Sequence, residues 1–571
     1  MTNDSFLRAA PRRHFVSPSC CSTGAATRRS RFSVLSVALT VGVLACVSTE
    51  SQCHEFFHED VLGTSLQLQV DSPSLNADRK TEAAVLREIE RLSRILSSYS
   101  DASEFNMLLK GPRIPRKTSP ELLEVLEACN HWSTISEGAF NPAAETFSRL
   151  WSRCAREHRL PLQDELDEAV RLAQSQSWEI DGDAQTVTRR GNAPLNLNAI
   201  AKGYIIDQAC RAALAHAPDV TGLLLNIGGD LRVCGDTAKT IGIADPRSPA
   251  DNAPPLCCIR LRNASVATSG NYERGFKIAG THYSHIIDPR TGKPVTDVVS
   301  ATVVAPRAEE ADALATILNV LEPTKGLALV NRLEDTECLL VRKDGEILKS
   351  TGWDGLSEPA DRVGFEPENG SPESGDTSLD PGEVPKEATA LLAAFDGVAE
   401  APQQQEAVQG ALWGEGFELL VNFEISRPRR FRYNRPYVAA WVEDADGKPV
   451  RTLCLWVSDF QWLGDLRRWN YLYGRNRKFV HAVSRATRSP GKHQLLWDGR
   501  ADNGQYVPAG QYTVLIEAVR EHGTYGLIRQ QVDLGDKPFE EQLRGNYEIR
   551  QASLEYREKK PSDESEGKSA S

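Results

Sequence analysis

The chain has 571 residues, of which 40% are hydrophobic, so we expect two or three domains, each with its own core. Its formal net charge of −12 argues against a domain that binds nucleic acid through a basic surface. Outside the N-terminus, no apolar run is long enough to cross a membrane.

The N-terminal segment is typical of an export signal. A basic stretch, residues 28–31, precedes an apolar run at residues 32–45, which is short for a membrane-spanning helix. Residues 43–46 read VLAC and resemble a bacterial lipobox, in which Cys46 would become the lipidated first residue. Ordinary signal cleavage is the alternative. We therefore expect residues 1–53 to be a signal or lipoprotein segment and the mature protein to lie on the periplasmic side of the cytoplasmic membrane.

The cysteines that follow the signal are scattered and form no CxxC pair. Cys257 and Cys258 are adjacent, which makes a disulfide between them awkward. We expect neither a zinc site nor a disulfide framework, but isolated buried thiols.

The first predicted elements alternate between strand and helix. Residues 61–70 alternate in hydrophobicity and predict a strand, whereas apolar residues recur at helical spacing over 79–98. Ser119 and Pro120 predict a helix start, because serine caps a helix and proline suits its first position. This helix should end near Ser136.

Further along, residues 195–207 predict a strand-to-helix turn whose backbone amides favour an anion. Residues 223–233 predict a hairpin around two glycines and no dinucleotide-binding fingerprint. A β-branched strand at 298–304 precedes a helix that opens at Glu309. The strands expected to close the domain are 337–342 and 346–350.

Asp312 and Thr316 lie four residues apart, so they share one face of that helix. A carboxylate and a hydroxyl are oxygen donors that suit a hard cation such as Mg²⁺. His285 lies between two short runs with strand character and can accept a proton near neutral pH. A hard metal and a base together suggest chemistry on a phosphate.

Five motifs occur in an order that resembles the FAD:protein FMN transferases, the ApbE family. They read NLNAIAKGYIID, LLNIGGDLRVCG, SG-Y-ER, SHIIDPRTG and ADALAT. The similarity covers roughly residues 55–356 and implies an α+β flavin-transferase core, which we place at 54–357.

The resemblance also implies roles for individual residues. Mg²⁺ would be held by Asp312, Thr316, Ala315 and the carbonyl of Ala199, and His285 would be the catalytic base. The implied FAD-binding residues are Leu62, Tyr99, Ala139, Phe140, Asn141, Asn196, Lys202 and Ile286.

Three of these positions depart from the family pattern. Leu62 replaces a methionine that contacts flavin, and Asn141 and Asn196 each replace an aspartate. Without the resemblance, a core tyrosine at a helix end would be an equal alternative for Tyr99, and a solvated helix lysine the better one for Lys202.

Residues 297–302 read DVVSAT, which resembles the acceptor motif that the family's enzymes modify. Self-flavinylation at Thr302 is conceivable, but a buried core strand is the stronger expectation, because a buried threonine cannot reach a catalytic site.

The C-terminal third changes character twice. Residues 358–410 are rich in Pro, Glu, Gly and Ser, as in a disordered linker. Residues 411–557 predict an all-β sandwich that resembles a bacterial periplasmic domain of unknown function often found beside flavin transferases, and 558–571 a charged tail. Its predicted strands are 417–425, 437–444, 451–457, 494–498 and 512–519. Interleaved aromatic and basic residues at 462–478 are expected to pack the sandwich or to contact a protein partner.

The resulting hypothesis is Mg²⁺-dependent transfer of FMN from FAD to a threonine of an acceptor protein with a DxxSAT-type motif, with release of AMP. An FAD pyrophosphatase and a non-enzymatic FAD-binding lipoprotein are the alternatives.

Overall fold

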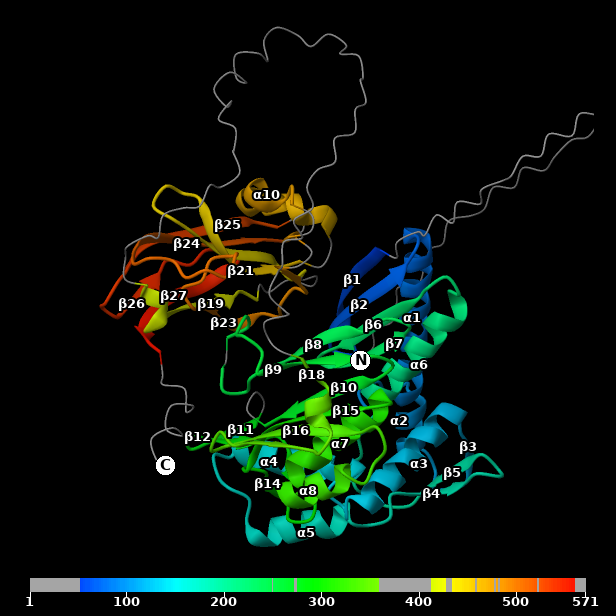
Figure 1. The fold of residues 1–571 in the computed structure, drawn as a ribbon. Coiled ribbons are helices and arrows are strands. Elements are labelled where there is room, and N and C mark those ends of the chain that lie inside the picture. Colours follow the sequence, from blue (N-terminus) through cyan, green and yellow to red (C-terminus); the bar gives the residue numbers. More distant parts are fainter. Residues whose placement is uncertain are drawn as a thin grey trace, which may run out of the picture. The chain divides into compact units, whose positions relative to one another are not determined.

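The computed structural model describes residues 52–248, 250–271, 275–358, 412–427, 434–457, 460–476, 479–480, 483–520 and 523–559. Residues 1–51 of the predicted signal or lipoprotein segment, including Cys46, and all but the first residue of the predicted linker lie outside the described residues. The last two residues of that segment, Gln52 and Cys53, belong to the first strand of the fold. Two domains are seen, at residues 52–358 and 412–559, and each is described by itself (Figure 1).

The first domain is built on an eight-stranded antiparallel sheet (Figure 1). Its strands, in spatial order, are β1 (Gln52–Val61), β2 (Thr64–Ser72), β6 (Gly222–Ile227), β7 (Asp230–Gly235), β10 (Ser265–Gly270), β15 (Val298–Ala305), β16 (Glu337–Arg342) and β17 (Ile347–Lys349).

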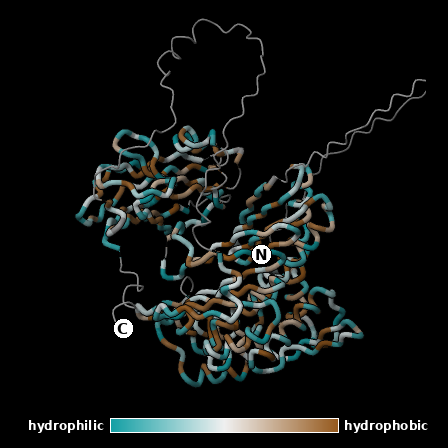
Figure 2. The backbone as a smooth tube through the Cα atoms, in the orientation of Figure 1, coloured by the Kyte–Doolittle hydropathy of each residue, from teal (hydrophilic) through white to brown (hydrophobic). Residues whose placement is uncertain are grey.

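Three helices, α1 (Leu75–Leu96), α6 (Ala201–His216) and α7 (Ala308–Val320), cover one face of this sheet. Both faces of the sheet are buried, and strand β15 illustrates this. Val303 packs into the core beneath the helices, whereas its neighbour Val304 packs into a second core on the opposite face. Figure 2 shows the hydrophobic residues following these strands and helices in brown.

The second core lies under a three-stranded sheet of β8 (Lys239–Ile243), β9 (Cys257–Leu261) and β18 (Ser357–Glu358). The remaining helical elements are α2 (Glu104–Lys110), α3 (Pro120–Ile135), η1 (Pro142–Ala144), α4 (Glu145–Arg156), α5 (Gln163–Ala173), α8 (Pro323–Val330) and η2 (Trp353–Gly355). The short strands are β3 (Arg116–Lys117), β4 (Trp178–Asp181), β5 (Thr186–Arg189), β11 (Gly275–Ile278), β12 (Thr281–Ser284), β13 (Ile287–Asp288) and β14 (Lys293–Pro294).

Most of the expected elements of this domain are present, and two differ. The strand expected at 61–70 is interrupted, because Leu62 and Gly63 adopt φ of 52° and 77° and turn the chain between β1 and β2. A strand leading into a helix was expected at residues 195–207. The helix, α6, is present, but the residues before it form an irregular loop and no strand. Thr302 is buried in β15, as expected of a core strand, and its hydroxyl lies 2.9 Å from that of Thr268.

The second domain is a sandwich of a four-stranded and a five-stranded sheet. The first contains β23 (Gly491–Trp497), β19 (Phe417–Ile425), β27 (Ile549–Glu558) and β26 (Phe539–Leu543); the second contains β22 (Ser484–Arg485), β21 (Pro449–Trp456), β20 (Tyr437–Glu443), β24 (Gly510–Val519) and β25 (Tyr525–Leu534). The helical turns are η4 (Trp413–Glu415), η5 (Phe460–Asp465) and α10 (Arg467–Tyr473).

Strand β20 is buried along its whole length because both of its faces are covered. Val438 and Val442 face the core between the sheets, and Trp441 faces a second cluster that includes Trp469 of α10. The aromatic and basic segment at residues 462–478 therefore packs against the sandwich in part, which was one of its two expected roles. Its Tyr471 is 81% exposed. The strands β22, β25, β26 and β27 were not predicted from the sequence, and β27 runs one residue into the predicted tail.

Candidate active site

The loop at residues 195–200, which leads into α6, joins the segments expected to bind flavin. Its Asn198 side chain donates a 2.8 Å hydrogen bond to the Tyr99 hydroxyl, and the Leu197 amide donates to the Ser98 hydroxyl. The Asn196 amide donates to the carbonyl of Pro142. Tyr99, Asn196 and the loop around Asn141 are therefore neighbours in space, although about a hundred residues separate the first two.

A cavity of about 570 Å³ opens beside this loop. Tyr99, which is 82% exposed, and Asn196 both line it, so a planar ring entering the cavity could meet the tyrosine ring. Basic side chains contribute to the same wall: Lys110, Arg113, Arg149 and Arg189. The cavity thus combines an aromatic surface with positive charge.

The Asn141 side chain is used within the fold. Its oxygen accepts from the Ala143 amide and caps η1, and its nitrogen donates to the Ala173 carbonyl at 3.1 Å. Ala139 and Phe140 before it are buried. An aspartate at this position could also cap η1, but it could not donate a hydrogen bond to the Ala173 carbonyl. This hydrogen bond is a structural reason for asparagine at position 141.

Leu62 is held in the left-handed region at the turn between β1 and β2 and packs against the main core. A bulky residue in this conformation is uncommon and strained. The neighbouring turn, between β6 and β7, lies close by, because the Gly228 amide donates to the Ser65 carbonyl and a β-carbon on Gly228 would lie 2.6 Å from Thr64. Asp230 opens the strand that follows this turn.

A cluster of buried charges lies where α6, α7 and β7 meet. The Lys202 ammonium forms a 2.7 Å ion pair with Asp230, which is 4% exposed. Asp312 is 8% exposed and accepts a 3.2 Å hydrogen bond from the Gly203 amide. Burial, and then the Asp230 charge, raise the pKa of Asp312 to about 8. Burial likewise raises the pKa of Asp230.

Asp230 is the site residue that the sequence reading missed. Its Gly-Gly-Asp motif predicted only a hairpin, and nothing in the sequence shows that the carboxylate faces Lys202 and Asp312. Two carboxylates and one ammonium leave the cluster with excess negative charge when both acids are ionised. Such a site favours either a proton or a cation.

Gly203 lets α6 and α7 approach closely. A β-carbon at this position would lie 2.2 Å from the carbonyl oxygen of Ala308 and 2.7 Å from the α-carbon of Glu309. The same approach brings the Gly203 amide to Asp312, which explains why the AKGY sequence places glycine directly after Lys202.

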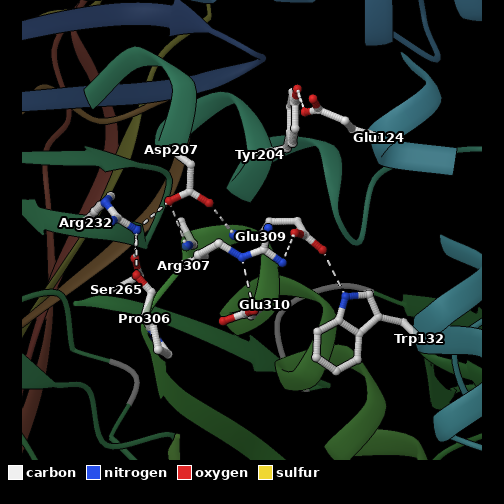
Figure 3. A network of polar contacts seen from close by, with 11 residues as sticks. Glu124, Trp132, Tyr204, Asp207, Arg232, Ser265, Pro306, Arg307, Glu309 and Glu310 are labelled. Carbon is white, nitrogen blue, oxygen red and sulfur yellow. Dashed lines mark hydrogen bonds and ion pairs between the residues drawn. The ribbon is translucent and has the colours of Figure 1, made fainter. Parts of the chain in front are cut away.

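A polar network fixes the start of α7 (Figure 3). The Asp207 carboxylate accepts from the amides of Ala308 and Glu309, at 2.9 and 3.0 Å, and pairs with Arg232 at 2.6 Å. Asp207 thus satisfies amides that the helix itself cannot bond. Glu309 is also buried; it accepts from the Trp132 indole at 2.9 Å and pairs with Arg307 at 2.8 Å. These contacts set the direction in which α7 presents Asp312 and Thr316.

Thr316 is half-buried on α7, and the carbonyl of buried Ala315 accepts from the Asn319 side chain at 3.0 Å. Ala199 lies in the turn before α6. Within the described residues, no group of three or more His, Cys, Asp or Glu side chains is arranged to hold a metal. The predicted ligands differ in kind, since they are one carboxylate, one hydroxyl and backbone oxygens.

His285 is exposed between β12 and β13, where buried Ile286 anchors the chain. The Ile286 amide donates to the Ser284 hydroxyl, and its carbonyl accepts from Val295 at 3.0 Å. Arg290 in the following hairpin donates to the Val320 carbonyl at 3.5 Å. The histidine thus projects from a segment tied to the end of α7.

Known proteins match both domains. Residues 62–340 match the family described as ApbE family, and residues 418–551 match the one described as predicted periplasmic protein (DUF2271). The FAD:protein FMN transferase of Treponema pallidum (strain Nichols) is 30% identical over 342 residues, covering 55% of this chain and 93% of that protein. The FAD:protein FMN transferase of Klebsiella pneumoniae (strain 342) is 29% identical over 279 residues, covering 48% of this chain and 86% of that protein.

The fold is also similar to the crystal structure of the apbe protein from Thermotoga maritima, with a TM-score of 0.49 and 28% sequence identity. The match covers 54% of this chain and 100% of the Thermotoga chain. The match to the Treponema relative extends over 93% of that protein. The chain therefore belongs to the ApbE family.

Proposed function

We propose that the protein is an FAD:protein FMN transferase that uses Mg²⁺ to move FMN from FAD to a threonine hydroxyl of another protein. The buried carboxylate of Asp312, whose pKa is raised to about 8 beside Asp230, is the observation that supports this best, because such a carboxylate is stabilised by a bound cation. The curated relatives that match residues of this domain carry the name of this activity.

The residues present fit a hard cation. The Asp312 carboxylate, the Thr316 hydroxyl and the backbone oxygens of Ala199 and Ala315 are the oxygen donors proposed to hold Mg²⁺. When bound, the ion supplies positive charge that stabilises the pyrophosphate oxygens of FAD during transfer.

The 570 Å³ cavity is proposed to receive part of FAD. The exposed ring of Tyr99 offers a stacking surface, and Asn196 offers amide hydrogen bonds from the same wall. Leu62, Ala139, Phe140, Asn141 and Ile286 are the other proposed flavin contacts. Lys202, now paired with Asp230, lies at the buried charge cluster and can contribute its charge to the pyrophosphate end.

His285 is proposed to take the proton from the acceptor threonine. The threonine oxygen then forms a bond to the FMN phosphorus, the bond from that phosphorus to the bridging oxygen breaks, and AMP leaves. The exposed position of His285 suits this role, because a protein acceptor must reach the base from solvent. We expect His285→Ala to bind FAD with unchanged affinity and to lose at least a hundredfold in transfer rate, an order of magnitude typical of a general base.

A product balance tests the proposal. The protein is incubated with FAD, Mg²⁺ and an acceptor fragment carrying a DxxSAT-type threonine, and AMP, free FMN and protein-bound flavin are measured. Transfer gives AMP and bound flavin in equal amounts with no free FMN. Free FMN equal to AMP would instead identify a pyrophosphatase, and unchanged FAD a binding protein.

The protein is proposed to be exported and to lie on the periplasmic side of the cytoplasmic membrane. The support for this is that the second domain matches a family described as a predicted periplasmic protein. Among the described residues, no helix is long and apolar enough to cross a membrane. Lipidation of Cys46 remains part of this proposal. Labelling of cells with a radioactive fatty acid tests it, since Cys46→Ser should abolish incorporation; labelling that survives this change would reject it.

A further inference from the structure

Two cysteines from different elements line one small cavity of the first domain. Cys210 lies on α6 and Cys234 on β7, and they are 1% and 5% exposed. Both line a cavity of about 250 Å³ together with Arg232. Their side chains are near enough for each thiol to shift the pKa of the other. The sequence predicted isolated thiols, because its scattered cysteines form no CxxC pair.

The surroundings distinguish the two sulfurs. Burial raises the pKa of Cys210 well above its usual range. The hydrogen bond from Cys210 and the positive charge of Arg232 lower the pKa of Cys234, in spite of burial. These shifts make Cys234 the more acidic of the two thiols, and the more acidic thiol of a neighbouring pair is suited to attack first.

The other described cysteines lack this arrangement. Burial raises the pKa of their thiols: Cys53, Cys129, Cys154, Cys257, Cys258, Cys338 and Cys454. The buried ones among them, Cys129, Cys154, Cys258, Cys338 and Cys454, serve as internal controls for reaction with a thiol reagent.

We propose that Cys210 and Cys234 are a redox-active pair that forms a disulfide between α6 and β7 by exchange with a disulfide-bearing oxidant. The Cys234 thiolate attacks the oxidant, forms a mixed disulfide and releases one thiolate. Cys210 then loses its proton and attacks the Cys234 sulfur, which releases the second thiolate. Two cysteines are oxidised and one external disulfide is reduced to two thiols.

The consequence concerns the site, because α6 also carries Lys202 and β7 also carries Asp230. A bond between Cys210 and Cys234 would join the two elements whose side chains form the buried ion pair. The inference does not depend on which reaction the site performs.

Peptide mapping tests the proposal on the full chain. The folded protein is treated with 2-hydroxyethyl disulfide, a small neutral disulfide, then alkylated in denaturant and digested with trypsin. The expected product is a disulfide-linked pair of the peptides Gly203–Arg211 and Val233–Lys239, which contain the two cysteines. A reducing agent should separate the pair, and the control cysteines should be recovered alkylated.

Single substitutions test the order of the steps. Cys210→Ser should stop at a mixed disulfide on Cys234, whereas Cys234→Ser should leave Cys210 alkylated. Absence of the linked peptides in the wild-type chain would overturn the proposal. A mixed disulfide on Cys210 in the Cys234→Ser chain would overturn the assignment of Cys234 as the attacking sulfur.

Discussion

At the scale of single residues, the site depends on a carboxylate that is costly to ionise. Asp312 is buried next to Asp230, and its pKa is raised to about 8. The folded state therefore holds this proton over a pH range in which the unfolded chain, with an ordinary aspartate, has lost it. The position of Asp312 on its helix could be predicted from the spacing to Thr316. Its shifted pKa could not, because it arises first from burial in the fold and then from the charge of Asp230, which is remote in the sequence.

This shift predicts a pH-dependent stability in the absence of metal. A raised carboxyl pKa stabilises the fold at low pH, and that stabilisation is lost as pH rises from about 4 to about 8, by up to about 1.4 kcal/mol per pH unit. In EDTA, the Tm of the first domain should fall over this range and level off above pH 8. Thermal unfolding followed by circular dichroism at intervals of half a pH unit measures it.

Mg²⁺ should counteract this loss, because it binds the ionised carboxylate. The Tm increase caused by Mg²⁺ is therefore expected to be larger at pH 8.5 than at pH 6. Asp230→Asn should move the midpoint of the pH effect downward, since it removes one cause of the shift. An Asp312→Asn protein with the same pH and Mg²⁺ response as the wild type would contradict the assignment.

At the scale of elements, the site depends on the close packing of α6 against α7. Gly203→Ala should force the helices apart, because the added carbon meets the backbone of Ala308 at 2.2 Å. We expect a loss of about 1–3 kcal/mol in unfolding free energy and weaker Mg²⁺ binding. Urea denaturation measures the first, and titration with Mg²⁺ the second.

Gly355→Ala is the matched control, since no atom lies within 4 Å of the carbon it would add. It should change the unfolding free energy by less than about 0.5 kcal/mol. Equal effects of the two substitutions would show that the helix contact is not responsible.

Elements with local signals could be predicted from the sequence. The structure confirms α3, whose start is marked by Ser119 and Pro120, and β19, whose bounds match the prediction. The turn at Leu62 was missed because hydrophobic alternation continues across it, and a leucine at positive φ gives no turn signal. Strand β26 was missed because its side chains are exposed or only partly buried, so it lacks an apolar face.

At the scale of the whole molecule, the two domains have separate hydrophobic cores. The sequence predicted two domains from the change in composition over residues 358–410. The two family matches lie at 62–340 and 418–551.

Separate cores predict separate unfolding transitions. Leu495 is fully buried in the sandwich core, so Leu495→Ala should destabilise that domain by about 2–5 kcal/mol. In calorimetry, one transition should move to lower temperature while the other, which responds to Mg²⁺, stays in place. A single transition that shifts as a whole would contradict the prediction.

The most direct test of the proposed transfer is the mass of the acceptor. An acceptor fragment with an exposed DxxSAT-type threonine is incubated with the protein, FAD and Mg²⁺, and its intact mass is measured. A gain equal to FMN less water, located on the threonine and absent when Asp312→Ala replaces the wild type, is the predicted result. An unchanged acceptor mass, while AMP and free FMN accumulate, would contradict transfer and identify hydrolysis of FAD as the activity of this site.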